Sequence, residues 1–102
     1  MFQLIKSKVM MTLLNQVKEL VAPVISDEMM EGGFQEFSIT DEGLAIDVEC
    51  EHYVDWIDNR GGLHCVIAPK SILAYVSDED GNFGKPVDFT SEFSEYKYCL
   101  FN

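Results

Sequence analysis

Large apolar residues recur at nearly every second position from Leu44 to Trp56, and this pattern restricts the chain to folds built on a long strand. Successive side chains of a strand point to opposite faces, so the alternation predicts one buried face and one solvated face. An antiparallel sheet commonly has this arrangement. The predicted buried face carries Leu44, Ile46, Val48, Cys50, His52, Val54 and Trp56, and the solvated face carries Ala45, Asp47, Glu49, Glu51, Tyr53 and Asp55.

Residues 7–21 have the spacing of an amphipathic helix instead. Apolar residues follow one another there at steps of three and four, which gathers them on one face. Ser7 is the predicted N-cap, and Pro23 predicts that the helix ends at Ala22, because proline disfavours helical geometry in the residue before it. The apolar face is formed by Val9, Met10, Leu13, Leu14, Val17, Leu20 and Val21.

The rest of the chain favours short strands. We predict strands at 34–40, 63–68 and 71–77, with Pro69 interrupting the hydrogen-bond ladder between the last two. Polar turns containing Asp and Gly separate the strands at 41–43, 58–62 and 78–82. Residues 93–101 fit both the helical spacing and the alternation of a strand. Their Tyr, Phe and Cys content favours a strand. The predicted fold class is α+β: a single domain, residues 1–102, with an N-terminal helix packed on a four- or five-stranded antiparallel β-meander.

Charge is distributed very unevenly. Residues 1–18 contain three lysines and no acid, whereas residues 19–102 contain all 18 acids and only four bases, giving a net charge of −11. Solubility of a small domain needs a net charge of only about 2–8 in magnitude. The excess predicts a basic protein partner and argues against direct binding to nucleic acid, whose phosphates are neutralised by Lys and Arg. The absence of a long apolar run predicts no membrane span.

The three cysteines are an odd number without paired spacing, which predicts free thiols and a reducing, cytoplasmic location. Cys50, His52, His64 and Cys65 are candidate metal ligands. The expected hairpin register separates the two histidines by roughly 10–13 Å, which is too far for one zinc ion. Asp78, Asp80 and Asn82 match the start of a calcium loop, but the required Gly and Glu are both Phe. We therefore predict no metal, no cofactor and no catalytic residues.

The acidic row on the central strand is the candidate binding surface. Alternate residues of a strand lie about 7 Å apart, so the row is similar to the charge track of a nucleic-acid backbone. This physical profile resembles that of DNA mimics, among them small phage inhibitors of restriction and CRISPR systems. The predicted partner-binding residues are Asp41, Glu42, Asp47, Glu49, Glu51, Tyr53, Asp55 and Asp58.

Three interpretations of the chain stay open at this point. The first is a non-enzymatic inhibitor of a basic, nucleic-acid-binding protein, of the anti-restriction, anti-CRISPR or toxin-immunity type; a phage-encoded protein of this type acts in the host cytoplasm. The second is a structural or accessory subunit that forms a homodimer through its sheet edge or helix. The third is a small enzyme or metal-dependent factor, for which the sequence shows no cleft with convergent polar groups. The acidic row itself also fits a solvated sheet face with no partner, because two charges about 7 Å apart in water repel by only roughly 0.6 kcal/mol.

Overall fold

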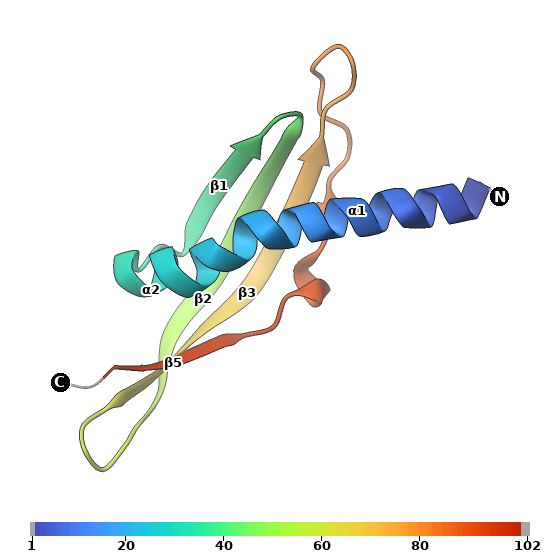
Figure 1. Cartoon of the computed structure of the whole chain (residues 1–102). Coiled ribbons are helices and arrows are strands. Elements are labelled where there is room, and N and C mark those ends of the chain that lie inside the picture. The colour runs from blue at the N-terminus through green and yellow to red at the C-terminus, as the bar shows by residue number, and fades with distance from the viewer. Residues whose placement is uncertain (1, 101–102) are drawn as a thin grey trace.

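One helical segment crosses one face of a five-stranded antiparallel sheet, which confirms the α+β class (Figure 1). The structure is a computed structural model that describes residues 2–100 and, of these, the side chains of residues 11–100. The predicted roles of Ser7, Val9, Met10 and residue 101 lie outside the described side chains. The helical elements are α1 (Phe2–Pro23), the π-helical turn η1 (Val24–Glu28), α2 (Met29–Gly32) and the 3-10 turn η2 (Thr90–Glu92). The strands are β1 (Glu36–Asp41), β2 (Leu44–Ile57), β3 (Leu63–Val76), β4 (Val87–Asp88) and β5 (Tyr96–Leu100).

The sheet follows the order of a meander only as far as β4. Strands β1 to β4 pair in sequence order, each antiparallel to the next. β4 pairs with Leu73 and Ala74 of β3, and β5 then returns to pair with 63–67 of the same strand. These two short strands therefore share one edge of β3. The return confirms the strand predicted near the C-terminus and brings it beside the β2–β3 hairpin.

The core lies between α1 and the sheet face turned toward it, which we call the inner face. Val17, Val21, Ile25 and Met29 recur every four residues and are all buried, so they form one continuous ridge along the helical segment. The ridge belongs to one apolar cluster with the inner-face residues Leu44, Ile46, Val48, Cys50, Ile67, Ile72 and Ala74. Phe37 and Ile39 of β1 pack against this cluster.

Pro23 does not end the helix, and this prediction is wrong. Its φ of −62° and ψ of −35° are helical, and the chain continues without a break into η1 and α2. Wide π turns occur where a normal hydrogen-bond ladder is disturbed, as it is here by a residue without an N–H. The segment ends at Gly33, whose positive φ of 67° gives a left-handed C-cap.

Pro69 does not split β3 either. The two strands predicted on its sides form one continuous strand with a register shift opposite Glu49 and Cys50, where Lys70 has no partner in β2. Ile67 and Ile72 are five positions apart and would face opposite sides of a regular strand. Because the bulge adds one residue, both side chains point to the inner face and are fully buried.

A second bulge places Trp56 on the opposite face of the sheet from the one predicted. Asp55 has no partner in β3, so Val54 pairs with Cys65 while Trp56 pairs with His64. The extra residue turns Trp56 to the outer face of the sheet, where it is 53 % exposed. Its assignment to the buried face is therefore wrong, whereas Leu44 to Cys50 alternate as predicted.

Substitution of Met29 tests the packing of the helical ridge. We expect Met29→Ala to lower the free energy of unfolding by about 2–5 kcal/mol, because it opens a cavity at a fully buried position. Met11, in the same helical segment, is 66 % exposed, so Met11→Ala should change stability by no more than about 0.5 kcal/mol. Urea unfolding of both variants measures the difference, and equal effects would contradict the proposed packing.

Candidate functional site

The outer face of the sheet carries the predicted acidic row. Asp47, Glu49 and Glu51 are exposed and alternate with the buried residues of β2, so all three point away from α1. Successive carboxylates of such a row are about 7 Å apart along the strand. Within residues 2–100, no helix covers this face (Figure 1). The three residues thus form a continuous, accessible acidic surface, which we call the acidic face.

β1 adds a carboxylate to the acidic face. Glu36 lies directly opposite Glu49 in the β1–β2 register and is also exposed. Side chains in such positions have Cβ atoms about 4.5–5.5 Å apart, and like charges there are destabilising. The alternation within β1 contained a signal for this residue, but only the hairpin register places it beside Glu49.

Few bases neutralise the acidic face. Among the side chains of residues 11–100, the one ion pair between a carboxylate and a Lys or Arg joins Lys70 Nζ to Glu51 Oε2 at 4.0 Å. Both side chains are more than half exposed, so the pair contributes little. Asp47 Oδ1 accepts a hydrogen bond of 2.8 Å from Ser38 Oγ, which orients the carboxylate without removing its charge.

Tyr53 continues the row beyond Glu51. Partial burial raises the pKa of its phenol, and the nearby carboxylates of Glu95, Asp55 and Glu51 raise it further. Glu95 precedes β5 and was not predicted at this surface, because its position depends on the return of β5 to β3. Tyr53 is therefore a neutral aromatic group surrounded by three acids.

The remaining predicted residues lie at the two ends of the sheet. Asp41 and Glu42 are exposed in the β1–β2 turn, where Asp41 Oδ1 accepts a hydrogen bond of 2.9 Å from the Glu42 N–H. Asp58 departs from the row and turns into the β2–β3 loop. Its Oδ1 accepts hydrogen bonds from the N–H groups of Arg60 at 2.9 Å and Gly62 at 2.8 Å.

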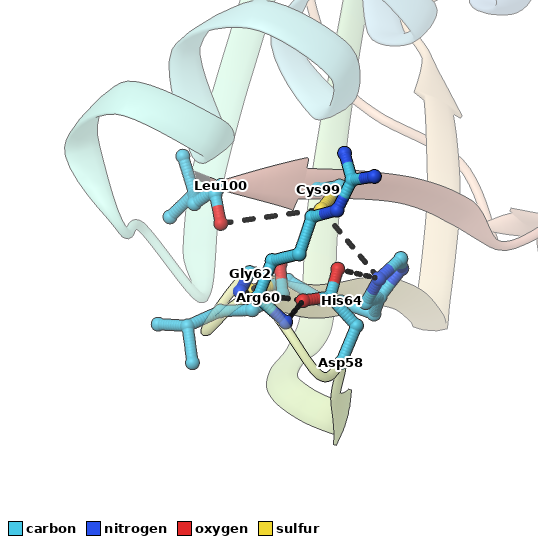
Figure 2. Close-up of polar contacts among 8 residues, drawn as sticks. Asp58, Arg60, Gly62, His64, Cys99 and Leu100 are labelled. Carbon is cyan, nitrogen blue, oxygen red and sulfur yellow. Dashed lines mark hydrogen bonds and ion pairs between the residues drawn. The ribbon is translucent and has the colours of Figure 1, made fainter. Parts of the chain in front are cut away.

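Asp58 lies beside two further polar side chains, His64 of β3 and Cys99 of β5, as Figure 2 shows. Its Oδ2 lies 3.0 Å from His64 Nε2, and the same nitrogen lies 3.6 Å from Cys99 Sγ. The hydrogen bonds from His64 and then from the Gly62 N–H hold the pKa of Asp58 below its usual value. Burial raises the pKa of the Cys99 thiol, and the neighbouring Asp58 carboxylate raises it further.

This cluster was not predicted. Asp58 and His64 are six positions apart and meet across the hairpin, but Cys99 reaches them only because β5 pairs with β3 at His64. A catalytic triad uses the two ring nitrogens of histidine for different partners. Here a single nitrogen contacts both Asp58 and Cys99, so the geometry is not that of an oriented base and its nucleophile.

The candidate ligands considered from the sequence do not come together. Cys50 and His52 point to the inner face, where burial raises the pKa of Cys50 to about 11 and His52 Nε2 is hydrogen-bonded to the Tyr98 hydroxyl. His64 lies on the outer face and the adjacent Cys65 on the inner face. In the calcium-like loop, Asp78 Oδ1 accepts main-chain hydrogen bonds from residues 80 and 82, which is the chemistry of a hairpin turn.

Comparison with models of known protein families, with curated proteins and with solved structures found no match. Among the described residues, no helix has both the length and the apolar character needed to cross a membrane.

The Asp58–His64 contact predicts a component of acid sensitivity. A carboxylate with a lowered folded-state pKa contributes stability that is present above its ordinary value of 3.8 and is lost as the pH falls through the lower folded value. We therefore expect Asp58→Asn to lose less stability than the wild type as the pH falls from neutral to values well below 3.8. Urea midpoints measured across this range test the prediction.

Asp78→Asn is the matched control, because Asp78 accepts the same kind of main-chain hydrogen bonds in the β3–β4 loop. An identical flattening of the pH profile in both variants would assign the effect to the loss of any loop carboxylate instead of to the contact with His64.

Proposed function

We propose that this protein is a small, non-enzymatic inhibitor that presents its acidic face to a basic, nucleic-acid-binding protein. An inhibitor of the phage anti-restriction or anti-CRISPR type, or an immunity protein bound to a toxin, works in this way. The observation that carries the proposal is the uncovered row of Asp47, Glu49 and Glu51, with Glu36 opposite Glu49. Tyr53, Asp55 and Glu95 extend this surface toward the β2–β3 hairpin.

The surface suits a basic groove in spacing and in rigidity. Its carboxylates project from paired strands, so the sheet fixes the backbone positions before a partner arrives and only side-chain freedom is lost on binding. A shallow hollow beside the row is lined by Glu36, Ser38, Asp47 and Glu49, together with Leu73. An Arg or Lys side chain placed there would meet carboxylates on two strands.

Charge repulsion within the acidic face supports a role in binding. Glu36 and Glu49 are directly opposed on neighbouring strands, and like charges in such positions are destabilising, so this pair does not favour folding. A basic partner relieves this repulsion when it binds. Complementary charge also accelerates association, and salt weakens this effect.

Reversal of the charges along the row tests the proposal. We expect the triple variant Asp47→Lys, Glu49→Lys and Glu51→Lys to bind the partner at least about a hundredfold more weakly, which corresponds to about 2.8 kcal/mol. The measurement is capture of basic proteins from a host lysate on the immobilised protein, with elution by increasing salt and competition by duplex DNA. Circular dichroism checks that the variant is folded.

A matched variant separates the acidic face from net charge. Glu28→Lys, Glu79→Lys and Asp80→Lys replace exposed acids outside this face. Each replacement changes the charge by two units, so both triple variants carry a net charge of −5 instead of −11. The control should retain the same captured proteins. Equal capture by the wild type and the face-reversed variant would refute the proposal.

A self-associating accessory subunit is the second candidate, and a separate observation favours it. Val54, Ile57 and Leu100 share the inner face near the tip of the β2–β3 hairpin, and each is 45–63 % exposed. Burial of this patch would give a dimer that persists at high salt, because apolar contacts are not screened. Sedimentation velocity at low and high salt measures this, with Ile57→Asp as the disrupting variant. A monomer at every concentration would exclude this candidate.

A further inference from the structure

Three donor atoms of different chemistry converge where the β2–β3 loop meets β5 (Figure 2). They are an oxygen of Asp58, Nε2 of His64 and Sγ of Cys99, and all lie within 4.8 Å of one another. This is the one group of three or more such ligands found among the side chains of residues 11–100. The three residues come from a loop and two strands, so the tertiary structure alone brings them together.

We propose that Asp58, His64 and Cys99 form a binding site for a divalent transition-metal ion, with zinc as the best chemical match. Tetrahedral zinc with ligand bonds of about 2.0–2.3 Å places its ligand atoms roughly 3.3–3.8 Å apart. The His64–Cys99 separation of 3.6 Å already has this length, and the Asp58–His64 separation of 3.0 Å needs to open by a few tenths of an ångström. A mixed oxygen, nitrogen and sulfur set suits zinc better than magnesium or calcium, which prefer oxygen ligands alone.

The surrounding residues hold the ligands in position. Asp58 Oδ1 is occupied by the N–H groups of Arg60 and Gly62, which leaves Oδ2 for an ion. The Trp56 indole stacks on the His64 ring, with centroids 3.9 Å apart and planes 10° from parallel. This stacking restricts rotation of the His64 ring and so helps to fix the direction of Nε2. The outward position of Trp56 therefore places its indole against the His64 ring.

An ion can reach the site from solvent. The His64 and Asp58 side chains are 29 % and 18 % exposed, and a hollow of the outer face, lined in part by Trp56, His64 and Cys99, adjoins them. The three protein ligands leave a fourth position for water.

Two bases lie nearby, since Lys97 lines the hollow and Arg60 belongs to the loop. Removal of the exposed Arg60 charge should therefore strengthen metal binding.

Binding of zinc has a defined proton balance and a structural consequence. The Cys99 thiol loses its proton to solvent, and His64 binds through Nε2 with its proton on Nδ1, so affinity increases with pH. The bound ion joins β5 to the β2–β3 hairpin and should raise the melting temperature, because it binds the folded state alone. This site uses none of Asp47, Glu49 or Glu51, and its existence is independent of the proposed function.

Cobalt(II) and zinc titrations of the reduced, metal-free protein test the proposal. We expect one ion per chain, a thiolate-to-cobalt charge-transfer band in the near ultraviolet, displacement of cobalt by zinc, and a higher melting temperature with zinc. Cys99→Ala should lose the band and the thermal shift. Asp58→Asn retains an oxygen for the loop hydrogen bonds but loses the carboxylate ligand, so its affinity should fall by at least about tenfold.

Cys65→Ala is the matched control, because it also leaves two thiols in the chain and Cys65 points to the opposite face. This variant should keep the band, the stoichiometry and the thermal shift. Absence of stoichiometric binding to the folded wild type would overturn the proposal. A charge-transfer band that persists in Cys99→Ala would also overturn it, because the thiolate ligand would then be another cysteine.

Discussion

The packing of one helical ridge against one face of the sheet is the contact on which the rest of the structure depends. Val17, Val21, Ile25 and Met29 supply that ridge, and the inner-face residues of β2 and β3 complete the core. Burial of this apolar surface is the main favourable term in folding. Because a single helical segment covers only one side, the opposite face stays in water along β2. That face is free to carry charge, and here the charge is almost entirely acidic.

Two bulges decide which side chains belong to each face. At Lys70, the added residue keeps Ile67 and Ile72 on the same side, so the core continues across a proline that would otherwise end the ladder. At Asp55, the added residue has the opposite effect and moves Trp56 out of the buried set. Bulges bend a strand and redirect side chains, and they are frequent near functional sites. In this protein, one bulge preserves the core and the other places an aromatic ring against His64.

The outer face combines two surfaces with separate chemistry. The acidic face gains nothing for stability from its directly opposed pair, Glu36 and Glu49, and the ion pair between Glu51 and Lys70 is exposed and long. The cluster of Asp58, His64 and Cys99 is built differently, since each member has a hydrogen-bonding partner within the cluster. The first surface suits recognition of a large basic partner, and the second suits a single ion.

The sequence by itself determined the α+β class, the long central strand from Leu44, the outward direction of Asp47, Glu49 and Glu51, and the separation of His52 from His64. These features depend on local periodicity and on turn residues such as Gly43, which act over a few positions. Only the tertiary structure decided that the helical segment continues past Pro23, that Trp56 faces outward, and that Glu36, Glu95 and Cys99 join sites formed by β2 and its loop. The reason is that bulges and strand register depend on packing between distant segments, and the pairing of β5 with β3 leaves no periodic signal in the chain.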